Sequence, residues 1–156
     1  MRLTDILTLE RLVPPDQTEA IDSQDGAMEA LSELLSEGVG VESLRVCRAL
    51  EEREALQSTA IGDGVAIPHA AIDGLQHQRA AMLLCRKGIE FHAIDDRPVT
   101  IVVGVVGPGQ ATLKHLRMLS GIFRLLCDRS LRQDLLQSHS REQAYRLIRR
   151  YERLRA

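Results

Sequence analysis

His69 is the residue of this sequence best placed for covalent chemistry. It ends the run Gly62-Asp63-Gly64-Val65-Ala66-Ile67-Pro68-His69, in which the glycines allow a sharp turn and the proline favours an extended residue before it. A neutral imidazole can attack phosphorus and carry the phosphoryl group as a covalent intermediate. Because its unperturbed pKa is about 6.5, such a ring is largely neutral near pH 7. The pattern predicts a nucleophilic histidine presented by a stiff backbone.

Two other side chains could hold a phosphoryl group at His69. His115 is predicted in the first turn of a helix, where free backbone N–H groups and the helix dipole attract an anion and disfavour an imidazolium. Arg53 is predicted at the end of another helix, sixteen residues before His69, and a guanidinium can bind two phosphate oxygens at once. Each of the three alone has a plainer interpretation as a structural or solvated residue, so the hypothesis depends on their combination.

These residues lie in a longer pattern of motifs. Arg53-Glu54, followed by Ser58 to His69, resembles the phosphorylation motif of the enzyme IIA domains of the fructose–mannitol class of the bacterial phosphoenolpyruvate-dependent phosphotransferase system. Within that class the chain most resembles the stand-alone nitrogen-regulatory proteins. The resemblance covers nearly the whole chain, through Ile89-Glu90-Phe91, Ile94-Asp95, Pro98-Val99 and His115-Leu116.

The resemblance implies a role for each candidate residue and a set of partners. His69 would be the phosphorylated residue, His115 the second active-site histidine, and Arg53 part of the same site, with no metal or organic cofactor. The donor would be the phosphocarrier protein HPr or a similar carrier, and the acceptor a IIB domain or a regulatory target protein. The chain would be a phosphohistidine carrier rather than a turnover enzyme. Nitrogen-related regulation is the first expectation, and a stand-alone sugar-specific enzyme IIA of the fructose or mannitol type is the alternative.

The sequence departs from the family pattern at the residue after the active histidine and in the glycine-rich loop Gly107-Pro108-Gly109-Gln110, where relatives are often more polar. Members commonly have glycine directly after the active histidine, and this chain has Ala70. If the site needs a positive φ there, alanine is disfavoured and the loop must differ. We also expect a shallow apolar docking surface around His69, formed by Ile61, Val65, Ala70 and Ala71.

Other kinds of site fit the sequence less well. His69 and His115 with Asp63 or Asp73 could form a metal site, but two histidines are few for such a site, and the sequence has no His-x-x-x-His or Cys-x-x-Cys spacing. Gly62-Asp63-Gly64 lacks the longer glycine pattern and the following lysine of a nucleotide-binding loop. The arginines near the carboxyl end alternate with apolar residues, which is typical of an amphipathic helix with a charged outer face.

The segments that must position these residues alternate between helical and extended patterns. We predict a helical turn over 4–7, helices between Ser23 and Gly38 and from Ser43 to about Glu54, and strands over 65–67, 79–85 and 98–106. Further helices are predicted over 112–127, 131–137 and 141–154. This order indicates one α/β domain over 1–156, and the resemblance implies a mixed sheet of about five strands covered by helices on both faces. On the helix over 112–127 the residues expected to face inward are Leu113, Leu116, Leu119, Ile122, Phe123 and Leu126.

The composition narrows the class of protein. The chain has 156 residues, a net charge of −2, no tryptophan, and two residues each of phenylalanine and tyrosine. These values argue against nucleic acid and anionic membranes as partners. Three widely spaced cysteines indicate free thiols in a reducing compartment. The sequence has no apolar run long enough to suggest a signal peptide or a membrane-inserted segment. We therefore expect a cytoplasmic protein.

Overall fold

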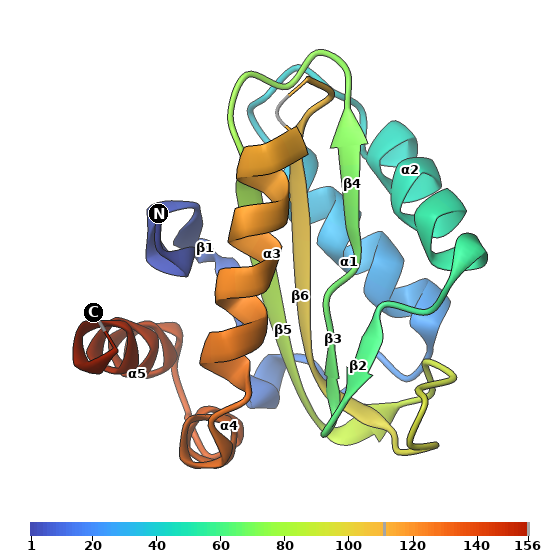
Figure 1. Cartoon of the computed structure of the whole chain (residues 1–156). Helices are drawn as coiled ribbons and strands as arrows, with labels where there is room; N and C mark the ends of the chain where they lie inside the picture. Colours follow the sequence, from blue (N-terminus) through green and yellow to red (C-terminus); the bar gives the residue numbers. More distant parts are fainter. Residues whose placement is uncertain (111, 156) are drawn as a thin grey trace.

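The computed structural model describes residues 1–110 and 112–155 as one mixed β-sheet with helices on both faces (Figure 1). Two single turns of 3-10 helix, η1 (Leu3–Asp5) and η2 (Pro15–Gln17), flank the first strand. The strands are β1 (Leu7–Val13), β2 (Ala60–Gly62), β3 (Val65–Ala66), β4 (His69–Ile72), β5 (Arg79–Ile89) and β6 (Val99–Pro108). The helices are α1 (Gln24–Ser36), α2 (Ser43–Leu56), α3 (Thr112–Leu126), α4 (Arg129–Leu136) and α5 (Arg141–Leu154).

β6 is the strand that connects the two halves of the sheet. The order is β1-β5-β6-β3-β2, with β4 also paired to β6. β5 pairs with one edge of β6 and runs antiparallel to it. β3 and β4 both pair with the other edge of β6, one after the other, and both run parallel to it. Between them the Pro68 carbonyl accepts a hydrogen bond from the Val105 N–H at 2.9 Å. His69 therefore starts β4 in a fixed register, opposite Val105.

Each face of the sheet has its own apolar core. α1 and α2 cover one face, and α3, α4 and α5 cover the other (Figure 1). Consecutive residues of β5 alternate between the cores, so that Leu83 belongs to the first and Leu84 to the second. The prediction of a mixed sheet covered on both faces is confirmed, and the sheet has six strands instead of about five.

The first strand is the main element that the sequence interpretation missed. We expected a helical turn over 4–7, and the structure has η1 over Leu3–Asp5 followed by the strand β1. The pairing of β1 with β5 shifts register between Leu7 and Leu12. Because a bulge breaks the strict alternation of buried and exposed residues, the segment lacks the regular period that identifies a strand.

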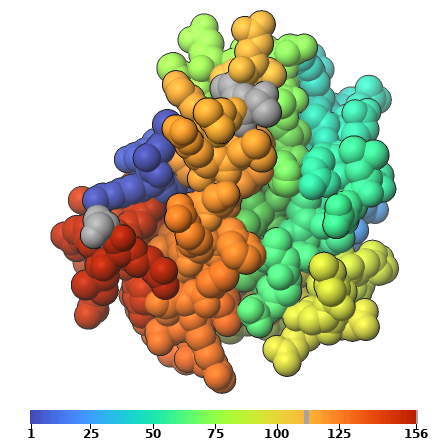
Figure 2. Space-filling model, viewed as in Figure 1, coloured from blue at the N-terminus to red at the C-terminus, as the bar shows by residue number. Residues whose placement is uncertain are grey.

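α3 is correctly located, but half of the residues expected to face inward are exposed. Leu113, Leu116 and Phe123 are 61, 56 and 43% exposed. The buried stripe runs instead through Met118, Ile122, Leu125 and Leu126. α3 carries apolar residues over more of its circumference than one core contact can cover, so its second apolar stripe remains at the surface. In the space-filling view α3 (orange) crosses the front of the molecule, between the green β2–β4 segment and the red α5 (Figure 2).

Candidate phosphoryl-transfer site

The side chain of His69 is oriented by the backbone of its own segment. Its Nδ1 lies 2.8 Å from the carbonyl oxygen of Ile67. A carbonyl oxygen only accepts, so Nδ1 carries the proton in this contact. In the neutral ring the free electron pair is therefore on Nε2, which makes Nε2 the nucleophilic atom of the half-buried side chain.

A short chain of hydrogen bonds connects this contact to α2. The Glu54 carboxylate accepts from the Thr59 N–H at 3.0 and 3.1 Å and from the Thr59 hydroxyl at 2.6 Å. The Thr59 carbonyl in turn accepts from the Ile67 N–H at 3.1 Å. Glu54 thereby positions the residue whose carbonyl orients His69. In the sequence Glu54 is part of the motif with Arg53, but its residue type and position alone indicate no role.

The structure brings His115 next to His69. His115 is the fourth residue of α3, and the centroids of the two rings are 5.7 Å apart at an angle of 50°. Burial lowers the pKa of both rings, and the charge of His69 lowers the pKa of His115 further. Both imidazoles are consequently neutral near pH 7, so His69 keeps the electron pair that a nucleophile requires.

Arg53 is the cation that faces His69. Its Nη1 donates to the Gln57 carbonyl at 2.9 Å, which keeps the guanidinium at the carboxyl end of α2. Burial is the largest cause of the lowered pKa of His69, and the positive charge of Arg53 lowers this pKa further. The hydrogen bond to the Ile67 carbonyl acts in the opposite direction and raises it. All three residues selected from the sequence are thus brought to one place.

A cleft of about 650 Å³ opens beside His69, between the end of α2 and the middle of α3. Both sides contribute polar and apolar residues, so the cleft offers phosphate-binding groups next to a surface that an apolar partner can cover. Five of its lining residues were not assigned to the site from the sequence, because nothing distinguishes them there from other helix and loop residues. These are Gln57, Leu119, Ser120, Phe123 and Arg124.

The expected docking surface is partly corrected by the structure. Ile61 and Ala71 are exposed, but Val65 and Ala70 are buried and cannot contact a partner directly. Val65, in β3, belongs to the core beneath α3, α4 and α5. Ala70, in β4, pairs with Val106 of β6. Ala70 is absent from the residues with positive φ in the described part of the chain. Alanine therefore causes no backbone strain after the histidine.

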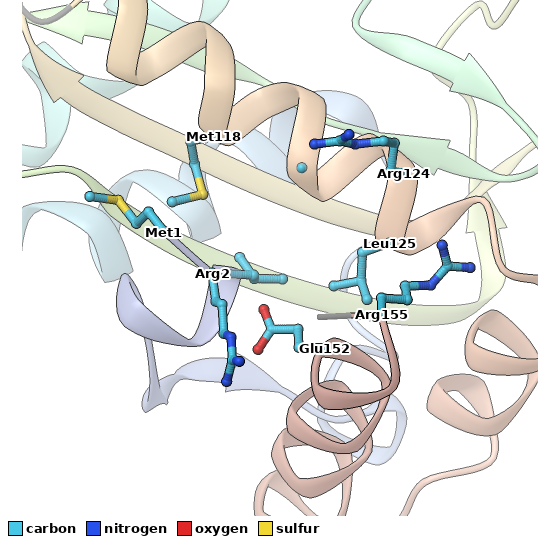
Figure 3. Close-up of a pocket in the computed structure, with 9 residues that line it drawn as sticks. Met1, Arg2, Met118, Arg124, Leu125, Glu152 and Arg155 are labelled. Atoms are coloured by element: carbon cyan, nitrogen blue, oxygen red, sulfur yellow. The ribbon is translucent and has the colours of Figure 1, made fainter.

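A second hollow lies on the other side of α3, and it contains no histidine. Its volume is about 450 Å³, and Met118 and Leu125 of α3 point toward Glu152 of α5 and Arg2 across it (Figure 3). The Glu152 carboxylate accepts from the N–H and hydroxyl of Thr4 at 3.2 and 2.6 Å. Without a histidine, this hollow does not share the chemistry of the cleft at His69.

Residues 1–110 and 112–155 have neither a cluster of metal ligands nor a membrane-spanning helix. Within these ranges no three histidine, cysteine or acidic side chains lie close enough to share a metal ion. His69 and His115 with Asp63 or Asp73 form no such group among these residues. Within the same ranges no helix has the length and apolar character needed to cross a membrane.

Known proteins resemble this chain in sequence and in structure. The family model "Phosphoenolpyruvate-dependent sugar phosphotransferase system, EIIA 2" matches residues 11–151. A fructose-specific EIIA component from Haloferax volcanii is 32% identical over 143 residues, which cover 91% of this chain and 93% of that protein.

Solved structures agree with this family match. The nitrogen regulatory protein IIA-Ntr from Neisseria meningitidis superposes with a TM-score of 0.86 at 30% identity, covering 92% of this chain and 97% of that one. The Escherichia coli enzyme IIA mannitol, solved in complex with phosphorylated enzyme IIB mannitol, shares the fold with a TM-score of 0.76 at 19% identity, covering 92 and 99%.

Proposed function

Since this chain belongs to the EIIA 2 family of the phosphoenolpyruvate-dependent sugar phosphotransferase system, we propose that it is a phosphocarrier that accepts a phosphoryl group on Nε2 of His69. The contact between Nδ1 of His69 and the Ile67 carbonyl, at 2.8 Å, is the observation on which this proposal mainly rests. It leaves Nε2 as the nucleophile beside Arg53 and His115.

The transfer needs no proton to enter or leave. The electron pair of Nε2 forms a bond to phosphorus while the P–N bond of a phosphohistidine donor breaks, and the electron pair of that bond stays on the donor ring. The Ile67 carbonyl stabilises the positive charge that develops on the His69 ring. Arg53 and the His115 N–H are positioned to stabilise the phosphoryl oxygens, which carry the charge of a loose transition state.

We propose an HPr-like phosphocarrier as the donor, in the cytoplasm. The exposed apolar side chains of Ile61 and Phe123 line the cleft and would contact this donor protein. The acceptor is a regulatory target protein, or a IIB domain in the alternative of a sugar-specific role. Phosphorylation would add about two negative charges beside this apolar surface, which favours some partners and repels others. The same event can therefore serve transfer or signalling.

The test is labelling by a complete donor chain. We would incubate the protein with phosphoenolpyruvate, enzyme I and the carrier, and map the phosphorylated residue. His69→Ala should abolish labelling, whereas His77→Ala, at an exposed position nearby, should leave it unchanged. Undiminished labelling of the His69→Ala protein would refute the assignment.

A second measurement separates the two roles. The labelled protein is mixed with a purified IIB domain of the fructose type, and the loss of its phosphate is followed. Rapid transfer supports the sugar-specific role, and a phosphoprotein that stays labelled supports regulation.

A further inference from the structure

Gln78 brings a buried, unpaired amide to the second histidine of the site. The residue is only 8% exposed, and within the described residues both amide atoms lack a hydrogen-bond partner. The two ring nitrogens of His115 are equally buried and equally without a partner there. The structure has no hydrogen bond between the two side chains. Leaving such groups unpaired is costly, so both side chains retain unused hydrogen-bonding capacity beside the site.

The two side chains meet over a glycine. Arg79 pairs with Val106 in the antiparallel ladder, so Gln78 lies opposite Gly107, beyond the last residue pair. A Cβ atom at Gly107 would be 3.1 Å from Cγ of Gln78 and 3.4 Å from Nδ1 of His115. Because Gly107 has no side chain, the Gln78 side chain and the His115 imidazole can both approach the space beside its Cα.

We propose that Gln78 is a positioning residue for His115, and that its amide pairs with Nδ1 and fixes which ring nitrogen is free for the phosphoryl group. A neutral imidazole has one donor and one acceptor nitrogen. When the Gln78 NH₂ group donates to Nδ1, the proton of the ring is on Nε2. That N–H can then donate to a phosphoryl oxygen carried by His69.

The chemistry of an amide suits this task better than that of a carboxylate. A carboxylate at position 78 would accept only, and it would hold the proton of His115 on Nδ1. The electron pair of Nε2 would then face the phosphoryl oxygens and repel them. Burial lowers the pKa of His115, so the ring cannot easily take a second proton to correct the wrong tautomer.

The importance of Gln78 for transfer rests on the proposed function, but its pairing with His115 can be tested without any phosphoryl donor. The protein is labelled with ¹⁵N-histidine, and the tautomer of His115 is determined by NMR at about pH 8, where a ring of ordinary pKa is neutral. The variants are Gln78→Leu, which removes the hydrogen bond, and Gln78→Glu, which only accepts. Gln76→Leu, at an exposed position of the same loop, is the control.

We expect the wild-type and Gln76→Leu proteins to carry the His115 proton on Nε2. Gln78→Leu should give a mixture of tautomers, and Gln78→Glu should move the proton to Nδ1. An unchanged tautomer in both Gln78 variants would overturn the proposal. This result is independent of the donor chain, so it separates a failure of the Gln78 pairing from a failure of the phosphocarrier assignment.

The rate of phosphorylation gives the functional measurement. Loss of one hydrogen bond to the ring should slow the labelling of His69 in Gln78→Leu on the order of tenfold, and Gln78→Glu should be slower still. Gln76→Leu should react at the wild-type rate. A Gln78→Leu protein that changes tautomer and reacts within about twofold of wild type would refute the role in transfer.

Discussion

At the scale of single residues, the orientation of His69 by a main-chain carbonyl has a chemical consequence. A carboxylate in the place of the Ile67 oxygen would fix the same tautomer, but its full negative charge would stabilise the imidazolium strongly. The carbonyl raises the pKa of His69 less than burial lowers it, and Arg53 lowers it further. The ring is therefore held in one orientation and stays neutral, so Nε2 keeps its electron pair near pH 7.

The first prediction concerns the pH dependence of this ring. Because the folded-state pKa of His69 lies below the ordinary value of about 6.5, the neutral nucleophile persists as the pH falls, and labelling should persist with it. In Arg53→Gln, loss of the nearby positive charge should raise the pKa and shift the loss of labelling to higher pH. The midpoint can be measured by NMR titration of the His69 ring protons.

The matched control is Arg48→Gln, at an exposed position of the same helix. Its midpoint should equal that of the wild-type protein. If Arg53→Gln leaves the His69 midpoint where it was, the guanidinium does not act on the ring.

The second prediction concerns Ala70, where relatives commonly have glycine. Ala70 is buried within β4 and has no positive φ, so glycine brings no relief of strain. Ala70→Gly should lower the free energy of unfolding by about 0.5–1 kcal/mol, because glycine loses more backbone entropy on folding. Urea denaturation measures this loss, and labelling of His69 should be unchanged. A more stable Ala70→Gly protein would show that alanine is strained here.

At the scale of elements, α2 and α3 enclose the site from two sides, and each carries more than one function. α2 supplies Arg53 directly and holds Thr59 through Glu54. α3 places His115 in its first turn, buries one apolar stripe against the sheet, and leaves Phe123 and Arg124 at the cleft. A change in either helix can therefore alter the site without touching His69.

Glu54 gives the third prediction. Its carboxylate makes three hydrogen bonds to one residue, Thr59. Glu54→Ala leaves the Thr59 groups without these partners and should lower the free energy of unfolding by about 1–3 kcal/mol. Labelling of His69 should also slow, because the Ile67 carbonyl is no longer held through Thr59.

Thermal unfolding and a labelling time course together check this prediction. Glu52→Ala, which removes an exposed carboxylate from the same helix, should change stability by no more than about 0.5 kcal/mol. Equal behaviour of the two variants would argue against a role of Glu54 in holding the loop.

An element could be predicted from the sequence when its pattern of apolar residues is regular. The strands near 79–85 and 98–106 are apolar on both faces, and the helices have clear apolar periods, so their places were correct. β1 was missed because its register shift between Leu7 and Leu12 hides the alternation. The exposure of Leu116 and Phe123 could not be predicted, because the helical period shows which residues share a face and not which neighbour covers it.

The site was predictable to a similar degree. His69, His115 and Arg53 were selected by residue type, by predicted position and by the family motif. Gln78 and Arg124 were not, since each is brought to the site only by strand register or helix packing. Contacts of this kind depend on the tertiary structure, which no local pattern encodes.

At the scale of the whole molecule, one sheet supports two separate cores. β5 and β6 provide residues to both, and every helix packs on one side or the other. His69 and its hydrogen-bonded neighbours lie along β6, between the α2 and α3 layers. The geometry of the site therefore depends on both faces being packed against the same strands.

The last prediction tests whether the two cores unfold together. Leu83 and Leu84 are adjacent in β5 and fully buried, one in each core. Replacing either with alanine should lower the free energy of unfolding by about 2–5 kcal/mol through lost burial and a cavity. Because both cores share β5 and β6, each variant should weaken amide hydrogen-exchange protection in α1 and in α5 to the same extent. If Leu83→Ala weakened α1 while α5 kept its wild-type protection, the faces would unfold independently, and the sheet would not couple α2 to α3 across the site.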